Sequence, residues 1–310
     1  MDLHRLALLR DLRRLGTVTA VARAAHVTPT AVSQQLKKLE REAGAALVRR
    51  VGRGLELTDA GVVLCDASDH VEVALARVQA TWDSWRGEVG GTVRLSIFPT
   101  AAQGLLPGLL DRLAAHPGLA LEVVEADLHG DEYAVHTDRV DVVVGHRAGV
   151  DGRWDPEAWA RRGVHVVPLV DEPLDVALPP DHPLLASGDL VAVQPGQLAD
   201  ESWVGVPEAW PFDRALEDWF AAAGLRPRIG LRFTDLRAQE ALVVGGHGPA
   251  LLPRFATDDR DGARLRLVPT AGLTQYRHVA ALARSDRAER VAVRVVLEAL
   301  RAQGRVYAGA

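Results

Sequence analysis

Four helix start and stop signals divide the first 44 residues into three short helical segments. Gly16 ends a leucine-rich segment, Thr17 begins the next, and Thr28-Pro29 opens a third that ends at Gly44. Threonine is a favoured N-cap, proline is favoured at the first helical position, and glycine often ends a helix. Because only two or three residues separate the second and third segments, they predict a helix-turn-helix, whose second helix fits the major groove of DNA.

The third segment has an apolar side and a polar side. Val32, Leu36 and Leu39 repeat at helical spacing and form the side expected to be buried. The polar side consists of Thr30, Ser33, Gln34, Lys37, Lys38 and Arg41, and the two lysines are the only ones in the chain. Glutamine can pair with adenine through two hydrogen bonds, and hydroxyl groups reach bases or phosphates, so this side suits DNA.

Two short strand-like pieces follow Gly44 and turn at Gly52-Arg53-Gly54, which predicts a β-wing with arginines placed for phosphates. We expect Thr30, Ser33 and Gln34 to read bases. The whole set of predicted DNA-binding residues is Thr28, Pro29, Thr30, Ser33, Gln34, Lys37, Arg49, Arg50 and Arg53. The alternative is a solvated three-helix bundle with ordinary surface charge.

The charge distribution agrees with this interpretation. Residues 1–58 contain eleven Lys or Arg and five Asp or Glu, a net charge of +6. The whole chain has a net charge of −5, so residues 59–310 have −11. A basic N-terminal module on an acidic body indicates contact with a polyanion.

A long helix is expected after Thr58-Asp59, which offer a cap and an acidic first turn. Its apolar residues recur every seven positions in two interleaved series, which predicts a dimer seam. The series are Leu64, Val71, Val78 and Trp85, and Ser68, Leu75 and Trp82. The alternative is an amphipathic helix packed on its own body. Cys65, the single cysteine, has no resolving partner, so we interpret it as a structural thiol.

From Thr92 the pattern changes to short apolar strands that alternate with helices, which predicts an α/β body. Strands at 92–98 and 120–126 flank a helix at 101–117, and a second α/β set begins near 164. Strand-like segments reappear near the end of the chain, after the second α/β set. This pattern predicts two lobes, with crossovers near Gly163–Val170 and Leu265–Val268. The strand-to-helix turns are expected to face a shared cleft that can hold an anionic group.

Several kinds of chemistry have no support in the sequence. Motifs for serine catalysis, nucleotide binding and histidine-based metal binding are absent, so we expect neither an enzyme nor a cofactor nor a metal. The nearest metal-ligand pair is Asp127-x-His129, which we assign to a surface loop. The lack of an apolar span, a secretory signal and a disulfide framework predicts a cytoplasmic protein without membrane contact.

The run AVSQQLKKLE-x-x-x-G and the later LELT-x-AG resemble the winged helix-turn-helix of LysR-type transcriptional regulators. Further along, TVRLSIFPTAAQGLLPGLL, EPLDVALPPDHPL and VVGGHGPALLP resemble the family's effector domain, which is similar to type 2 periplasmic binding proteins. The resemblance implies a multidomain fold: an all-α winged helix-turn-helix, a long linker helix and an α/β two-lobed domain. The boundaries are 1–58, 59–88 and 92–310, with lobe I at about 92–163 and 268–310 and lobe II at about 164–267.

The resemblance also implies where an effector binds. Positions that match the family's contacts are Pro99, Thr100, His146, Arg147, Val206, Pro207, Phe233 and Thr234. Thr100 is expected to cap the helix that begins near Ala101 and to donate to a carboxylate, with Arg147 pairing with the same group. Trp210 is expected to form part of the wall. Each position has an ordinary structural alternative, such as a cap, a core side chain or a solvated charge.

The resemblance implies a regulator that binds double-stranded promoter DNA as a homodimer or homotetramer. A small-molecule effector binds between the lobes, and RNA polymerase is a further partner. Two other classes of function remain as alternatives, a cytoplasmic small-molecule-binding protein and an α/β enzyme that uses the cleft between the lobes.

Overall fold

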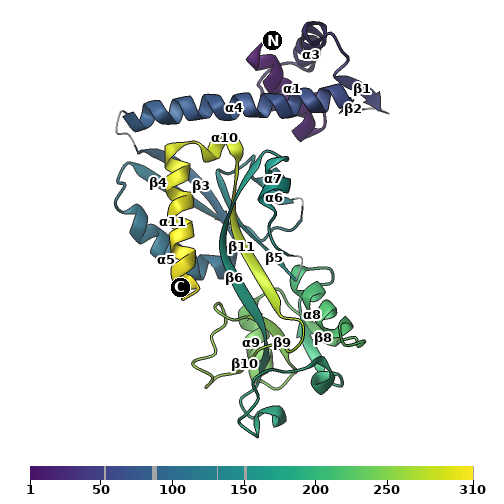
Figure 1. Ribbon diagram of the computed structural model, residues 1–310, viewed down its shortest axis with the longest axis vertical. Coiled ribbons are helices and arrows are strands. Elements are labelled where there is room, and N and C mark those ends of the chain that lie inside the picture. The colour runs from purple at the N-terminus through teal and green to yellow at the C-terminus, as the bar shows by residue number, and fades with distance from the viewer. Residues whose placement is uncertain (52–53, 86–88, 131, 150–151, 310) are drawn as a thin grey trace. The chain divides into compact units, whose positions relative to one another are not determined.

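The computed structural model describes residues 1–51, 54–85, 89–130, 132–149 and 152–309. They form two compact units, drawn in Figure 1. Unit 1 comprises residues 1–88 with 285–290, and unit 2 comprises residues 89–284 with 291–310. Among the helices that the structure describes, none combines the length and apolar character needed to span a bilayer.

Unit 1 begins with three helices whose ends fall where the sequence predicts them. They are α1 (Leu3–Leu15), α2 (Val18–Ala24) and α3 (Pro29–Ala43). The hydroxyls of Thr17 and Thr28 each accept a hydrogen bond of 3.2 Å from the N–H three residues later, so both act as N-caps. Gly16 and Gly44 end α1 and α3 at φ values of +73° and +68°, in the left-handed region that glycine adopts without steric cost.

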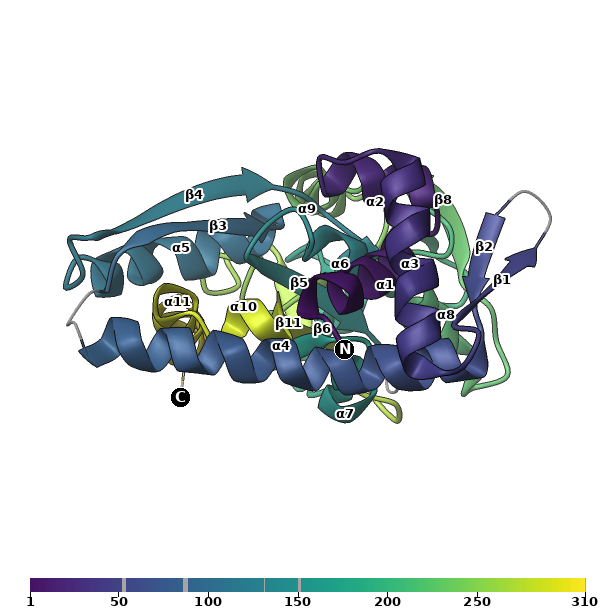
Figure 2. The ribbon, with the colours of Figure 1, turned by 90° about the horizontal axis from the view of Figure 1, so that it is seen from above.

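The three helices share one buried core, to which each contributes the apolar side predicted from the sequence. Leu9 of α1, Val21 of α2 and Leu39 of α3 are fully buried there. A hairpin of β1 (Val48–Val51) and β2 (Gly54–Leu57) follows as an antiparallel wing, visible in Figure 2. The two predicted strands are therefore present, whereas the turn residues 52–53 lie outside the described part.

A long helix, α4 (Asp59–Trp85), follows the wing, and unit 1 also includes the short α10 (Ser285–Ala288). The Thr58 hydroxyl accepts a hydrogen bond from the Gly61 N–H at 3.1 Å and donates one to the Ala46 carbonyl at 2.7 Å. A Cβ atom at Gly61 would overlap with the carbonyl oxygen of Leu47. Because glycine has no Cβ, the start of α4 can lie directly against the backbone that leads into the wing.

The seven-residue series predicted along α4 divides into two parts. Leu64 packs against the core of unit 1, and the buried Ser68 donates a hydrogen bond to the Cys65 carbonyl at 2.9 Å. The remaining members are 40–75% exposed and are Val71, Leu75, Val78, Trp82 and Trp85. Packing within the unit therefore explains the first two positions, and the later five form an apolar stripe on the helix.

Unit 2 is built on a seven-stranded sheet in the order β10-β6-β11-β5-β3-β4, with β9 also paired to β6. The strands are β3 (Gly91–Ile97), β4 (Leu119–Glu125), β5 (Val142–Ala148), β6 (Val164–Leu178), β9 (Ala250–Pro253), β10 (Arg266–Val268) and β11 (Gln275–Arg284). β3 pairs in parallel with β4 and β5, and α5 (Pro99–Leu113) connects β3 to β4. The predicted β-α-β start of the body is confirmed.

Helices cover the first lobe. α5 and α11 (Val291–Tyr307) pack closely at Gly104, where a Cβ atom would overlap with the ring of Tyr307. Glycine has no Cβ, so it permits this contact. A separate buried core joins α6 (Glu132–His136) and α7 (Pro156–Ala160) to the sheet, with Tyr133 and Trp159 against strand residues such as Leu282.

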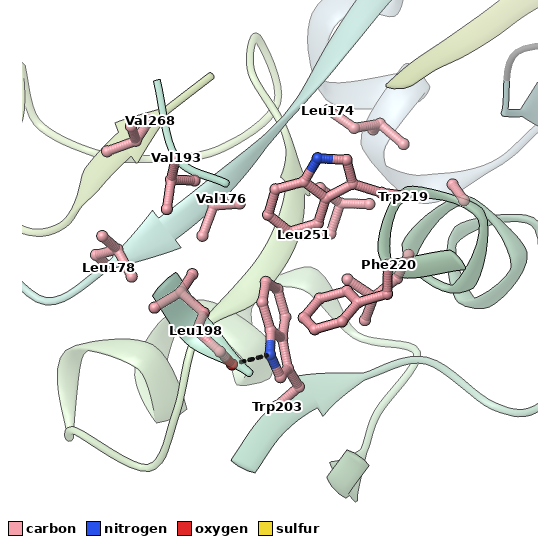
Figure 3. Close-up of a cluster of buried hydrophobic side chains, with 12 residues drawn as sticks. Leu174, Val176, Leu178, Val193, Leu198, Trp203, Trp219, Phe220, Leu251 and Val268 are labelled. Atoms are coloured by element: carbon pink, nitrogen blue, oxygen red, sulfur yellow. Dashed lines mark hydrogen bonds between the residues drawn. The ribbon is translucent and has the colours of Figure 1, made fainter. Parts of the chain in front are cut away.

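The second lobe is organised around the far end of β6. Its further elements are β7 (Ser202–Gly205) paired in parallel with β8 (Arg228–Arg232), α8 (Pro211–Ala221), α9 (Leu236–Val244) and 3₁₀ turns at Pro183–Leu185 and Pro195–Leu198. Figure 3 shows its core, in which Trp203, Trp219 and Phe220 meet edge to face. The indole N–H of Trp203 donates a hydrogen bond to the Leu198 carbonyl at 3.4 Å.

Two long strands connect the lobes. β6 pairs with β11 over Val164–Leu174, with β9 over Leu174–Ala177 and with β10 over Val176–Leu178. The sequence places the second crossing near Leu265–Val268, but those residues still pair with the far end of β6, and Thr270 bridges to Val193. The chain returns along β11 instead, because a short apolar run does not reveal which end of a long partner strand it joins.

Candidate functional site

Helix α3 presents a polar face on a well-anchored support. Val32 and Leu39 are fully buried, whereas Thr30, Gln34 and Lys37 are exposed on the opposite side. Ser33 is half-buried and donates its hydroxyl proton to the Pro29 carbonyl at 3.0 Å, which leaves its oxygen lone pairs to accept a bond. Thr28 and Pro29 are exposed at the helix start. The arrangement suits insertion of α3 into a groove.

The position of α3 relative to the wing and to α1 is fixed by polar contacts. The Glu40 carboxylate accepts hydrogen bonds from the N–H groups of Leu47 at 2.9 Å and Val48 at 3.2 Å. On the other side, Arg5 of α1 donates to Gln35 at 3.0 Å and forms an ion pair with Glu42. These contacts reduce the freedom of the two elements predicted to meet DNA.

Part of the positive charge of unit 1 is already paired with acidic residues of the same unit. Arg10 and Arg13 of α1 form ion pairs with acidic residues of α4, for example Arg10 with Glu72 at 2.7 Å and Arg13 with Asp66 at 2.6 Å. The exposed basic residues on the polar face of α3 and on the wing are Lys37, Lys38, Arg41, Arg49 and Arg50. The unit's basic surface therefore concentrates where α3 and the wing are.

The wing arginines differ in their surroundings. Arg49 lies opposite Glu56 in the hairpin and forms an ion pair with it at 3.3 Å, in which both side chains are more than half exposed. Such a pair is weak, so Arg49 can exchange Glu56 for a phosphate. Arg50 is exposed on the same strand. The prediction for Arg53 concerns a residue outside the described part of the chain.

A cavity of about 290 Å³ lies between the two lobes of unit 2. The structure places five of the eight predicted effector residues in its lining, namely Pro99, Thr100, His146, Val206 and Thr234. Trp210 also lines it, together with Phe98 and Phe212, so much of the wall is aromatic. The cavity is at the small end of the range for small-molecule sites.

The other three predicted residues are not in the lining. Successive residues of a strand point to opposite faces, so His146 of β5 faces the cavity and Arg147 does not. The Arg147 guanidinium donates to the Arg153 carbonyl at 3.2 Å and lies 5.8 Å from the ring centroid of Trp154. Pro207 and Phe233 are next to lining residues but do not line the cavity themselves.

Two other arginines do line the cavity, Arg237 of α9 and Arg277 of β11, and no motif in the sequence singles out either of them. The Arg277 side chain is 3% exposed; it donates to Thr100 Oγ1 at 2.7 Å and, from both Nε and Nη2, to the Oε2 atom of Glu172, which is fully buried. Glu172 also accepts hydrogen bonds from the N–H groups of Phe255 at 2.6 Å and Ala256 at 2.9 Å. One buried guanidinium therefore joins β11, β6 and α5 at the cavity.

Thr100 has a different local role from the one predicted. Helix α5 begins at Pro99 with Phe98 at the N-cap, and no side chain caps it, so Thr100 is not the cap. Its oxygen accepts from Arg277, and its own proton remains to donate into the cavity. No motif could reveal this pair, because 177 residues separate its members.

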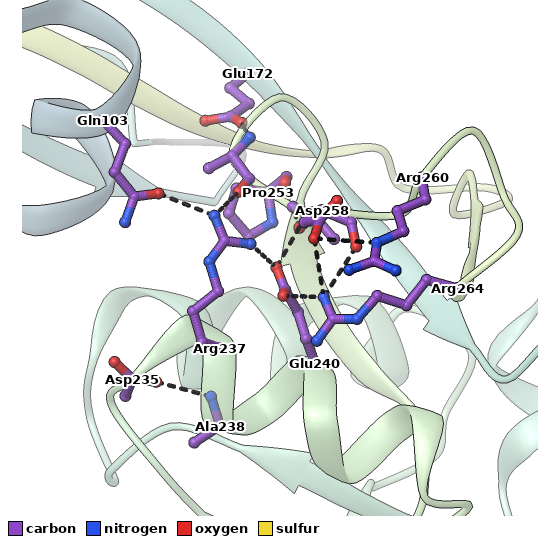
Figure 4. A network of polar contacts seen from close by, with 12 residues as sticks. Gln103, Glu172, Asp235, Arg237, Ala238, Glu240, Pro253, Asp258, Arg260 and Arg264 are labelled. Atoms are coloured by element: carbon purple, nitrogen blue, oxygen red, sulfur yellow. Dashed lines mark hydrogen bonds and ion pairs between the residues drawn. The ribbon is translucent and has the colours of Figure 1, made fainter.

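The opposite wall contains a charge network from the second lobe, shown in Figure 4. The fully buried Glu240 accepts from Arg237 and from Arg264, each at 2.5 Å. Arg237 also donates to the Gln103 side-chain oxygen of α5 at 2.9 Å, a hydrogen bond that links the two lobes. Both arginines that the described lining includes therefore have a carboxylate partner, Glu172 for Arg277 and Glu240, which Arg264 shares, for Arg237.

Two histidines lie at one corner of the cavity, His146 in its lining and His129 beside it. His146 Nε2 lies 3.2 Å from Asp127 Oδ1, and the imidazole rings of His146 and His129 are 6.1 Å apart. Burial lowers the pKa of His146, although the bond to Asp127 opposes the shift, so the ring is neutral near pH 7. Burial by itself would raise the pKa of Asp127, but the bond with His146 and the nearby charges outweigh it, so that pKa is lowered.

A winged helix-turn-helix unit together with a two-lobed α/β unit that encloses a cavity defines a DNA-binding regulator with a ligand site. Family models agree with both parts. Residues 3–62 match the bacterial regulatory helix-turn-helix protein of the lysR family, and residues 86–305 match the LysR substrate binding domain. The chain belongs to the LysR family of transcriptional regulators.

Relatives and solved structures extend the comparison across most of the chain. The transcriptional dual regulator OxyR of Escherichia coli is 30% identical over 269 residues, which cover 84% of this chain and 82% of that protein. The RuBisCO operon transcriptional regulator of Allochromatium vinosum is 27% identical over 251 residues, 80% of this chain and 78% of that protein. A full-length OxyR variant from Pseudomonas aeruginosa has the same fold, with a TM-score of 0.59 and 20% identity over 97% of this chain and 95% of that one.

Proposed function

We propose that this regulator reads an inverted-repeat promoter site through α3 and the wing, as a cytoplasmic homodimer or homotetramer with RNA polymerase as a further partner. The observation that supports it best is the exposed polar face of α3, with Gln34 and Lys37 on a helix anchored through Glu40. The proposal assigns 1–58 to DNA binding, 59–88 to dimerisation and 92–310 to effector binding. Two-fold pairing presents two recognition helices to two half-sites.

The cavity between the lobes is the proposed effector site. Its aromatic wall of Phe98, Trp210 and Phe212 suits a flat or apolar body, and the Thr100 hydroxyl suits one hydrogen-bond acceptor. Since both lining arginines are already paired with glutamates, an effector does not need a full negative charge. An effector that binds one arrangement of the lobes better than another shifts the population of the regulator toward that arrangement.

Cys65 is the only cysteine of this chain, and it is fully buried in unit 1. Burial raises its pKa to about 11, which keeps the thiol protonated and unreactive at neutral pH. We therefore propose that the effector binds without a covalent step at cysteine.

The proposal is tested with the full-length protein and a panel of small metabolites. Thermal unfolding identifies compounds that stabilise it, since a ligand of the native state raises the transition temperature. Each compound is then added to the protein bound to labelled DNA from upstream of its own gene. A compound that both raises the transition temperature and changes the affinity for DNA supports the proposal. Compounds that stabilise the protein without any change in DNA affinity contradict it.

A further inference from the structure

Three side chains converge at the corner of the cavity where β4 and β5 end. Asp127 and His129 lie on the segment after β4, and His146 lies on β5. Each offers one ligand atom, and these atoms all lie within 4.8 Å of one another. From the sequence alone Asp127 and His129 predict only a surface loop, because His146 is 17 residues or more away along the chain.

Three of the four imidazole nitrogens at this corner are buried and have no hydrogen-bond partner among the described residues. Neither ring nitrogen of His129 has a hydrogen-bond partner, and neither does Nδ1 of His146, whose side chain is 8% exposed. The ring of Trp210 lies 4.2 Å from that of His129, and the ring of Phe98 lies 4.6 Å from that of His146. Buried polar atoms are normally paired, so the unpaired nitrogens of His129 beside the contact between His146 and Asp127 point to a ligand at this position.

We propose that Asp127, His129 and His146 bind a divalent transition-metal ion of the Zn²⁺, Ni²⁺ or Co²⁺ class at the wall of the effector cavity. Two imidazoles and one carboxylate suit these ions, whereas Mg²⁺ and Ca²⁺ prefer oxygen ligands. The inference deepens the proposed function of the cavity and rests on it for its regulatory meaning.

The geometry is close to that of a metal site. Zinc with nitrogen and oxygen ligands at about 2.0–2.1 Å in a tetrahedron holds those ligand atoms about 3.3 Å apart. The distance between His146 Nε2 and Asp127 Oδ1 is 3.2 Å. His129 follows a strand on a loop, and no separation between the three ligand atoms exceeds that tetrahedral spacing by more than about 1.5 Å.

The site has an open side. Asp127 and His146 both line the cavity, so a fourth ligand from water or from an effector can approach from there. One carboxylate and two neutral imidazoles leave a divalent ion with a net charge of about +1. A bound ion would therefore supply the cavity with the uncompensated positive charge that its paired arginines do not provide, and would favour an anionic donor group.

The test is a metal titration of the untagged full-length protein without DNA, after removal of metals by a chelator. We expect one Co²⁺ per chain, detected by its visible absorption, with competition by Zn²⁺ and Ni²⁺ but not by Mg²⁺. Loss of an outer-shell partner already weakens metal affinity about 10–100-fold, so His129→Gln and Asp127→Asn should each weaken binding at least tenfold. His136→Gln is the matched control, because His136 also has a buried unpartnered nitrogen but lies outside the cluster.

Equal titrations of the wild type and of both ligand variants would overturn the metal site, and so would the absence of saturable binding. Thermal unfolding with Zn²⁺ provides a second readout, in which the ion should stabilise the wild type and His136→Gln but neither ligand variant. Metal binding that behaves as expected while DNA affinity stays unchanged would support the site and count only against regulation through the cavity.

Discussion

The guanidinium of Arg277 lies against the carboxylate of Glu172, and both side chains are buried beside the cavity. The pair joins the two strands that run through both lobes, and Arg277 also holds the hydroxyl of Thr100 at 2.7 Å. The stability of unit 2 and the shape of its ligand site therefore depend on the same ion pair.

Replacing one member of this pair should destabilise unit 2 strongly. Glu172→Gln leaves the Arg277 charge buried without a counter-ion, which we expect to cost about 3–5 kcal/mol. Chemical denaturation followed by tryptophan fluorescence measures the effect, because Trp203 and Trp219 are buried in unit 2. Glu298→Gln on the exposed side of α11 is the control and should change stability by less than about 0.5 kcal/mol. Equal effects of both substitutions would refute the role of the pair.

Thr100→Val should weaken effector binding without loss of the fold. The substitution keeps the side-chain shape but removes the hydroxyl that faces the cavity, and one hydrogen bond between neutral groups is worth about 0.5–1.5 kcal/mol. We therefore expect affinity for a ligand found in the metabolite screen to fall by roughly 2- to 10-fold. Arg147→Ala, outside the lining, should leave that affinity unchanged. If a calorimetric titration shows that Arg147→Ala weakens ligand binding and Thr100→Val does not, the result would favour the family-based assignment of Arg147.

A charge in the apolar stripe of α4 should dissociate the oligomer. Leu75 is 51% exposed in the single chain, and Leu75→Glu would place a carboxylate in the proposed seam. Light scattering coupled to size-exclusion chromatography should show a smaller molecular mass with unchanged helical circular dichroism. Val63→Glu is the control, because Val63 is 68% exposed but lies outside the heptad series. An unchanged mass for Leu75→Glu would assign dimerisation to another surface.

The Cys65 thiol should make unit 1 less stable in alkali. Its pKa is raised by burial from 9.0 to about 11, so between these values the unfolded chain loses the proton while the folded chain retains it. The unfolded state then binds fewer protons, and stability falls as the pH rises, by up to about 2–3 kcal/mol for two pKa units. The difference in unfolding free energy between wild type and Cys65→Ala should shrink across this range. A constant difference from pH 8 to pH 11 would show that the thiol titrates normally.

Local signals in the sequence are sufficient to predict the first three helices of unit 1. The caps at Thr17 and Thr28 and the glycines at 16 and 44 act on neighbouring backbone groups, so their spacing directly determines the helix ends. The heptad series along α4 was only partly informative. Periodicity does not distinguish residues that pack within a unit, such as Ser68, from residues left exposed, such as Val78.

The cavity was harder to predict because its contacts are distant in sequence. Thr100 and Arg277 meet only after β11 has paired between β5 and β6, and His146 meets Asp127 only through the order of the sheet. The family resemblance placed five lining residues at the cavity but also selected Arg147, whose side chain points away from it. Successive residues of a strand point to opposite faces of the sheet. Two residues that are adjacent in a motif, such as His146 and Arg147, can therefore lie on different faces.

The most direct test of DNA reading is the fluorescence anisotropy of the full-length protein on DNA from upstream of its own gene and on a scrambled duplex. Across a salt series, we expect tight, steeply salt-dependent binding to the upstream DNA, and Gln34→Ala should reduce the preference by about 1–3 kcal/mol. Arg50→Ala should instead weaken both complexes alike and lower the salt slope by about one unit. Equal affinity of the wild type for both duplexes, unchanged by Gln34→Ala, would contradict recognition of this DNA through α3.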